Sequence, residues 1–397
     1  MSDLKKQLYK ELEIKNAILV EGINVNPIIF QHLDLGGKYQ EQVHVLFEMD
    51  HHPHVGIDFP VGFTSPGGLK LPFRWDTRSQ YVIHYAEGKY YLTDNGQELF
   101  PIEFLTRPRY YDLKTSDGAE MSQVATYNRE GTIFVAYSNE CSLKEKDLDC
   151  LYCNINATKD TYAEKEGIYW KSPGQIGETA AAAYKEGARH ITISGGFIPE
   201  RREVDYYIDV AEAIKERTGL ADFNGTGVIG APLDLDVIDK YKEAGYRTIA
   251  MNIEFWDKNI FKAICPGKEA QCGGWDHWVK ALEYAVEVFG HGRVRSNIVG
   301  GIEPRKSTLE GVEYLASKGV VCFAGAWCPN PGSQLEGHRS PEPAWHFDLA
   351  KKIAAIFKKA GFTYEQLYDC AAAPTTLCHD IYKIEGELLP LFKEKTA

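Results

Sequence analysis

Short apolar, β-branched runs alternate with amphipathic segments from about residue 130 onward. The runs have the length of buried strands, and the segments between them repeat apolar residues with the period of a helix. Strands are predicted at residues 132–137, 190–194, 222–229, 247–254, 293–299 and 320–324. Helices are predicted at residues 172–187, 204–217, 235–244, 275–289 and 307–318. The pattern is typical of an α/β fold built from stacked parallel βα units.

The chain ends on either side of these units have other patterns. Residues 1–130 are rich in aromatic and β-branched residues with glycine turn signals, which predicts a smaller β-rich or mixed N-terminal domain. Residues 131–340 are predicted to contain all of the βα units, and residues 341–397 are predicted to be a helical extension. The sequence does not indicate what the N-terminal domain does.

Composition excludes several classes of partner. The 397 residues carry a formal net charge of −12 without a basic cluster, so nucleic acid is not an expected ligand. No apolar run approaches the roughly 20 residues that span a bilayer. The N-terminus lacks the apolar core of a signal peptide, and a cytoplasmic location with free thiols is therefore expected. On composition, a small molecule or a protein is the favoured partner class, and a small-molecule substrate is the prediction.

Three of the nine cysteines follow the first predicted strand. Cys141, Cys150 and Cys153 form a Cys-x8-Cys-x2-Cys pattern. Three thiolates on a cubane iron–sulfur cluster leave one iron open to a small ligand. A zinc site or a disulfide loop is the alternative, but the next histidine, His190, is distant and the expected compartment is reducing. The polar arm at residues 142–149 is expected to be a tolerant insertion.

This cysteine loop resembles that of the radical S-adenosylmethionine (SAM) superfamily, in which the first gap is three residues rather than eight. The resemblance covers about residues 130–365 and is greatest for the biotin-synthase-like group. It implies a (βα)6 partial TIM barrel, with the motifs at the C-terminal ends of its strands. Tyr152 would lie near the SAM adenine.

Further motifs follow the strands in the order that the resemblance implies. Ser194, Gly195 and Gly196 occupy the place of a Gly-Gly-Glu motif that receives the SAM amino group, although Phe197 replaces the acidic residue. Asn252 and Glu254 lie two apart on a predicted strand, so both are expected to face the barrel mouth and the SAM ribose.

The strand predicted at residues 293–299 would add a basic and an apolar contact to SAM. Arg295 is placed to pair the SAM carboxylate, and Ile298 to contact adenine, in a motif that continues to Glu303. A Cys-Pro-Asn-Pro-Gly loop beginning at Cys328 resembles a loop of the biotin synthase group.

The resemblance implies a [4Fe–4S] cluster on Cys141, Cys150 and Cys153, with SAM bound at its open iron. The enzyme would cleave SAM and abstract hydrogen from a small-molecule or cofactor-precursor substrate, using an electron donor such as flavodoxin or ferredoxin. Two alternatives remain open, namely radical modification of a peptide or protein, and a non-catalytic iron–sulfur or metal-binding barrel protein.

Other cysteine and histidine groups carry weaker indications. Cys328, Cys370 and Cys378 are the candidates for an auxiliary iron–sulfur cluster, although buried thiols acting as small apolar residues are the commoner explanation. The run from Asp50 to His54 contains three histidines, and an exposed loop is expected there rather than a metal site.

Overall fold

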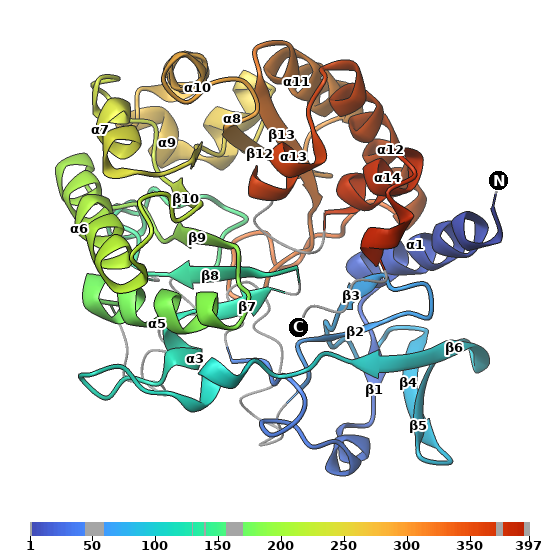
Figure 1. The fold of residues 1–397 in the computed structure, drawn as a ribbon. Helices are drawn as coiled ribbons and strands as arrows, with labels where there is room; N and C mark the ends of the chain where they lie inside the picture. The colour runs from blue at the N-terminus through green and yellow to red at the C-terminus, as the bar shows by residue number, and fades with distance from the viewer. Residues whose placement is uncertain are drawn as a thin grey trace.

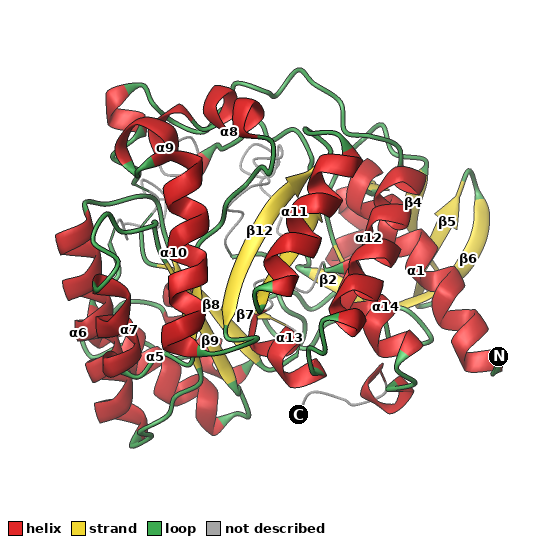
Figure 2. Ribbon diagram, turned by 90° about the horizontal axis from the view of Figure 1, so that it is seen from above, coloured by secondary structure: helices red, strands yellow, loops and turns green. Residues whose placement is uncertain are grey.

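A computed structural model of the protein describes residues 2–43, 59–128, 130–138, 140–155, 170–370 and 376–392. Its main feature is a curved seven-stranded sheet (Figures 1 and 2). In spatial order the strands are β13 (Val320–Ala326), β12 (Val294–Gly300), β11 (Thr248–Ala250), β10 (Gly225–Val228), β9 (His190–Ser194), β8 (Thr132–Ala136) and β7 (Thr126–Asn128). Strands β8 to β13 are parallel, whereas β7 pairs antiparallel with β8. The α/β class is confirmed.

Helices cover the outer face of this sheet (Figure 1). They are α5 (Pro173–Lys185), α6 (Glu200–Thr218), α7 (Val237–Ala244), α8 (Lys258–Ile264), α9 (Pro266–Gln271), α10 (Gly274–Phe289), α11 (Arg305–Ser317) and α12 (Pro343–Lys359). Ser172 caps α5 with the reciprocal bonds of a capping box, as its spacing to Gln175 predicts. Among the described helices, none has the length and apolar character needed to cross a membrane.

The N-terminal region forms a second sheet beside the first (Figure 1). Its strands, in spatial order, are β1 (Asn24–Val25), β4 (Tyr81–Ala86), β5 (Lys89–Asp94), β6 (Gln97–Phe104), β2 (Gly62–Thr64) and β3 (Lys70–Pro72). The preceding helix α1 (Asp3–Glu21) packs against α12 and α14 (Leu377–Glu385). There Lys15 Nζ lies 2.6 Å from Asp380 Oδ2 in a buried ion pair, so the two chain ends are joined.

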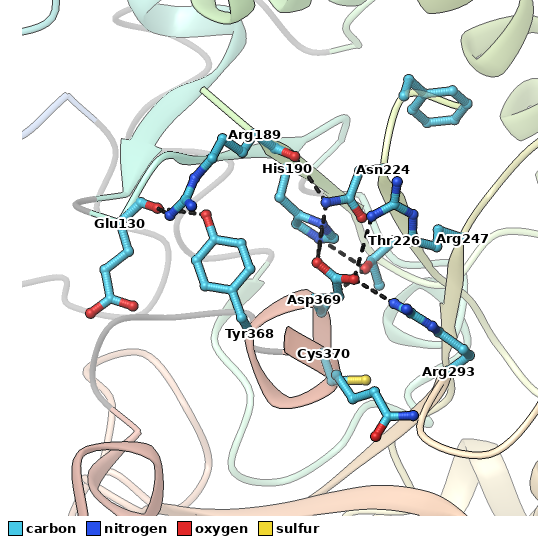
Figure 3. Close-up of polar contacts among 12 residues, drawn as sticks. Glu130, Arg189, His190, Asn224, Thr226, Arg247, Arg293, Tyr368, Asp369 and Cys370 are labelled. Atoms are coloured by element: carbon cyan, nitrogen blue, oxygen red, sulfur yellow. Dashed lines mark hydrogen bonds and ion pairs between the residues drawn. The ribbon is translucent and has the colours of Figure 1, made fainter. Parts of the chain in front are cut away.

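A C-terminal helix closes the amino-terminal end of the parallel sheet. Asp369, at the end of α13 (Tyr364–Cys370), pairs with Arg293 and receives a 3.1 Å hydrogen bond from Asn224 Nδ2 (Figure 3). Thr226 Oγ1 donates to the Asp369 carbonyl at 3.0 Å. This buried polar network fills the amino-terminal end, which leaves the opposite end for ligands.

Candidate active site

A cavity of about 450 Å³ lies at the carboxyl ends of the parallel strands. All of the predicted site residues except Ile298 line it, namely Cys141, Cys150, Tyr152, Cys153, Ser194, Gly195, Gly196, Asn252, Glu254 and Arg295. They come from the loops after β8, β9 and β11, from the last residue of β9 and from β12. The fold therefore brings these separate motifs together where βα barrels carry their chemistry.

The cysteine arm at residues 142–149 is packed against neighbouring loops. Leu143 is 3% exposed, and the Gly267 amide donates to the Leu148 carbonyl at 3.0 Å. The Ser142 amide donates to the Phe197 carbonyl at 2.9 Å, and Asp149 is buried against Lys144. The arm is therefore packed at both ends, with Leu143 and Leu148 against Gly267 at the start of α9. The expectation that the arm can be shortened stays a prediction, although the absence of packing on which it was based does not hold.

Two glycines allow the loop after β9 to approach this arm closely. A Cβ on Gly195 would lie 2.5 Å from the Tyr137 ring, and one on Gly196 would overlap the Glu140 carbonyl. The Gly196 amide donates to Ser138 at 3.2 Å, and the Tyr137 hydroxyl donates to Gly196 at 3.1 Å. Gly195 thus permits contact with the Tyr137 ring, and Gly196 permits contact with the Glu140 backbone. The expected approach of this loop to the SAM amino group stays a prediction.

Gly196→Ala is therefore expected to lower the stability of the metal-free protein by about 1–3 kcal/mol, because the added methyl overlaps a backbone carbonyl. Denaturant unfolding measures this effect. Gly174→Ala is the control, since its Cβ would meet nothing closer than Ser172 Oγ at 3.8 Å. Equal unfolding midpoints for the two variants would contradict the close approach.

Glu254 forms a buried ion pair at the cavity wall. Its Oε1 lies 2.7 Å from Lys268 Nζ, and the two side chains are 8% and 14% exposed. Lys268 also donates to the Asn252 carbonyl at 2.8 Å and lies 4.5 Å from the centre of the Trp278 ring. Burial opposes the charge on Lys268, yet the Glu254 carboxylate raises the pKa of that ammonium above its usual value. The pair keeps both charges at the cavity.

The backbone around Glu254 differs from the predicted strand over residues 247–254. β11 ends at Ala250, and Glu254 has a φ of 67°, in the left-handed region that a side chain disfavours. Its amide donates to Asn297 at 2.9 Å, and its carbonyl accepts from Val299 at 2.8 Å. Asn252 and Glu254 thus share the cavity through a turn held by β12, not through strand alternation.

Strand alternation does decide which residues of β12 face the cavity. Arg295, Asn297 and Val299 line it, whereas Ile298 is fully buried on the other face of the strand. The expected contact of Ile298 with adenine is not available from that position. Glu303 is also structural, because its Oε2 accepts hydrogen bonds at 2.9 Å from the amides of residues 256 and 257.

Arg295 carries an unused hydrogen-bond donor. The residue is 3% exposed, and its Nη1 donates to the Cys370 carbonyl at 3.2 Å. Its buried Nε has no hydrogen-bond partner, and it forms no ion pair with a carboxylate in the described part of the chain. Burial lowers the pKa of Arg295 to about 10. An anionic ligand would satisfy both the donor and the charge.

Parts of this sequence are similar to those of known proteins. Residues 137–315 match the sequence model of the Radical SAM superfamily. The chain is 27% identical over 313 residues to a bacteriochlorophyllide c C-7(1)-hydroxylase of Chlorobaculum limnaeum, covering 75% of this chain and 76% of that protein. It is 24% identical over 141 residues to a 5-amino-6-(D-ribitylamino)uracil–L-tyrosine 4-hydroxyphenyl transferase of Methanopyrus kandleri, covering 33% of this chain and 36% of the relative.

Residues 137–315 are therefore a radical SAM domain. The protein is an enzyme, as that domain and the enzyme relatives indicate. Among solved structures, methylornithine synthase aligns with a TM-score of 0.46 at 17% identity, covering 63% of this chain and 69% of that chain. The FeFe-hydrogenase maturase HydG of Carboxydothermus hydrogenoformans aligns with a TM-score of 0.42, also at 17% identity, covering 60% and 56%.

Radical SAM enzymes use a [4Fe–4S] cluster, and the thiols of this chain suit one. Cys141, Cys150 and Cys153 are each half-buried and line the same cavity. Within the described ranges, no three histidine, cysteine or acidic side chains converge on a single ion. A cubane cluster instead needs its thiolates spread around it, with one iron left open. The three-thiol donor set fits that cluster better than a closed zinc site.

The electrostatic surroundings of these thiols differ. A hydrogen bond with Cys265 and the charge of Lys268 lower the pKa of Cys150, against the opposite effect of burial. Burial and the charge of Cys150 raise the pKa of Cys153 to about 12. Tyr152 packs edge-on against Phe255, with ring centres 5.9 Å apart, and presents an aromatic surface to the cavity. The surroundings therefore favour the thiolate more at Cys150 than at Cys153.

The three cysteines considered for an auxiliary cluster have different surroundings. Cys328 Sγ donates to the Leu19 carbonyl at 3.0 Å, whereas Cys370 Sγ lies 3.6 Å from the Gly292 carbonyl. Cys378 alone of these three lines the cavity. They do not converge on a metal site in the described part of the chain. The histidine run at residues 50–54 lies outside the described residues.

Sequence reasoning missed three polar residues at the site. Lys268, Cys265 and Glu203 lie near or on the cavity, but they belong to helical segments that carry no recognised motif. Lys268 follows Cys265-Pro266-Gly267, where a proline beginning a new helix was the available signal. Their role depends on tertiary packing, which spacing along the chain does not show.

Proposed function

We propose that this radical SAM enzyme binds a [4Fe–4S] cluster through Cys141, Cys150 and Cys153 and abstracts hydrogen from a small organic substrate. The observation that carries this proposal is the shared cavity, where the three thiols meet the motifs of β9, β11 and β12. When bound, such a cluster supplies the electron that cleaves SAM to methionine and a 5′-deoxyadenosyl radical.

The chain's own residues would bind and orient SAM. We propose that Tyr152 covers the adenine, that the Ser194, Gly195 and Gly196 backbone receives the amino-acid end, and that Arg295 pairs the carboxylate. The unpartnered Nε of Arg295 supports the last assignment. The turn bearing Asn252 and Glu254 would hold the ribose hydroxyls.

A small-molecule substrate is favoured by the size and walls of the cavity. About 450 Å³ lies within the range of small-ligand pockets and is too small for a folded protein. Leu19 from α1, Phe323 from β13 and Leu377 from α14 add apolar surface to the cavity lining. The 27% identity to a bacteriochlorophyllide hydroxylase supports a cofactor-type or pigment-type substrate.

The remaining parts of the proposal concern organisation and partners. Strands β8 to β13 and their helices would act as the (βα)6 partial barrel of residues 131–340. The regions 1–130 and 341–397 would help to enclose the substrate, because Leu19 and Leu377 line the cavity. A flavodoxin or ferredoxin would supply the electron.

SAM cleavage tests the function. Anaerobically reconstituted and chemically reduced protein is expected to convert SAM to 5′-deoxyadenosine and methionine. The reductant supplies the electron for cleavage, and the reaction is slow without substrate because the 5′-deoxyadenosyl radical must then take its hydrogen atom from the reductant, the buffer or the protein. Chromatography of the quenched reaction measures both products. Equal amounts of the two are expected, and reduced protein that binds SAM but yields neither product would contradict the proposal.

A further inference from the structure

Arg295 connects the cavity to the buried polar network at the other end of the parallel sheet. Its side chain lines the cavity, yet its Nη1 donates at 3.2 Å to the carbonyl of Cys370, the last residue of α13. The last carbonyl groups of a helix have no partners inside the helix, and basic side chains are suitable donors to them. The end of α13 therefore holds one side of the Arg295 guanidinium.

The end of α13 is itself fixed through Asp369, which precedes Cys370 (Figure 3). The Asp369 carboxylate is buried, pairs with Arg293 and lies 3.6 Å from Arg247 Nη1. Its carbonyl accepts a 3.0 Å hydrogen bond from Thr226 Oγ1 on β10. Contacts from β10 and from the residues before β11 and β12 thus set the position of the backbone at residues 369 and 370.

These pairings also decide which arginine lacks a carboxylate. Arg293 and Arg247 share Asp369, whereas Arg295 contacts a neutral carbonyl and forms no ion pair in the described part of the chain. A buried guanidinium in this state is poorly compensated for the loss of water. An anionic group that enters the cavity would gain a charge-assisted hydrogen bond from it.

We propose that Asp369 is a positioning residue that acts on ligand binding through Arg295. By fixing the Cys370 carbonyl, it orients the guanidinium and leaves the remaining donors of that group for an anion. This inference rests on the proposed function, in which Arg295 pairs the SAM carboxylate. Asp369 does not line the cavity, so its effect is indirect.

Binding of two ligands to Asp369→Asn tests this inference. SAM carries a carboxylate, whereas 5′-methylthioadenosine has the adenosine part without the amino-acid group. Asp369→Asn in reconstituted protein is expected to bind SAM about three- to thirty-fold more weakly and 5′-methylthioadenosine within about two-fold of wild type, because the change reaches the site through packed groups. The ratio of the two affinities is the readout, since a general loss of packing would weaken both ligands.

A double-mutant cycle shows whether Asp369 acts through Arg295. Arg295→Met should itself weaken SAM binding, and adding Asp369→Asn should then cause no further loss of SAM affinity. Asp222→Asn is the matched control, because that carboxylate also pairs with Arg247, at 2.6 Å, but is exposed. The control should bind both ligands like wild type.

A milder variant keeps the question open to test if Asp369→Asn does not fold. Thr226→Val removes the hydroxyl that donates to the Asp369 carbonyl and keeps the charges of the network. It should also weaken SAM more than 5′-methylthioadenosine.

The outcomes separate this inference from the proposed function. Wild-type SAM affinity in the folded Asp369→Asn variant, or in Thr226→Val if only that variant folds, would show that the role of Asp369 is wrong although SAM binding stands. Equal weakening of both ligands would show the same. If Arg295→Met binds SAM like wild type, the carboxylate assignment fails together with this inference, and if wild-type protein does not bind SAM, the proposed function fails as well.

Discussion

Replacing Cys141, Cys150 and Cys153 together by alanine is expected to remove the iron–sulfur cluster and abolish SAM cleavage. The three thiols line one cavity, and their removal leaves no thiolate of that loop to hold iron. Iron and acid-labile sulfide analysis of anaerobically purified protein measures the loss, which should be about four irons per chain. Circular dichroism checks that the variant remains folded.

The matched control replaces Cys328, Cys370 and Cys378, which are also three of the nine cysteines. Cys328 and Cys370 contact backbone carbonyls and do not line the cavity, and Cys378 lies on α14, outside the cysteine loop. The control should therefore keep the iron and the SAM cleavage. Iron lost from the control but retained in the first variant would reverse the assignment of the cluster ligands. Partial loss from both would indicate two clusters.

Glu254→Ala is expected to destabilise the protein by about 3 kcal/mol and also to weaken SAM binding. The substitution leaves the Lys268 ammonium, which is 14% exposed, without its carboxylate, and a buried charge that loses its partner is costly. Denaturant unfolding measures the first effect, and equilibrium binding of SAM to reconstituted protein measures the second. Asp276→Ala, in the exposed Lys258–Asp276 pair, should change stability by less than about 1 kcal/mol.

A double variant separates the two effects of Glu254. Glu254→Gln with Lys268→Met removes both charges while retaining similar volumes, so stability should return toward the wild-type value. If Glu254 contacts the SAM ribose, affinity should stay low in this stable protein. Recovery of wild-type affinity would show that the single substitution acted through the fold and would remove Glu254 from the SAM site.

Much of the fold was predictable because its strands and helices have clear periodicity. The helix predicted at residues 275–289 is α10, Gly274–Phe289, and the strand predicted at 190–194 is β9, His190–Ser194. The strand predicted at 247–254 ends early at Ala250, and Glu254 lies in a turn with left-handed backbone geometry although it carries a side chain. Such a turn is stabilised by β12, which is distant in sequence, and local propensity does not indicate it.

The candidate site was predictable where a motif lies on one loop. Gly196 illustrates this, since only a residue without a side chain permits the contact with Glu140. Ile298 was misplaced because alternation along β12 turns it to the core. Lys268 and Glu203 were missed because only the folded chain brings them to the cavity, where Lys268 pairs with Glu254. The packing of the arm at Leu143 was missed for the same reason, because Gly267, which it contacts, belongs to a later βα unit.

Electron paramagnetic resonance of the reduced protein, with and without SAM, tests the central claim most directly. Protein that is purified anaerobically and then reduced is expected to show a [4Fe–4S] signal. Three thiolates leave one iron of that cluster free to bind SAM. Adding SAM should change that signal, and the variant lacking Cys141, Cys150 and Cys153 should show none. A cluster signal that SAM leaves unchanged, or iron-free protein after reconstitution, would contradict the account.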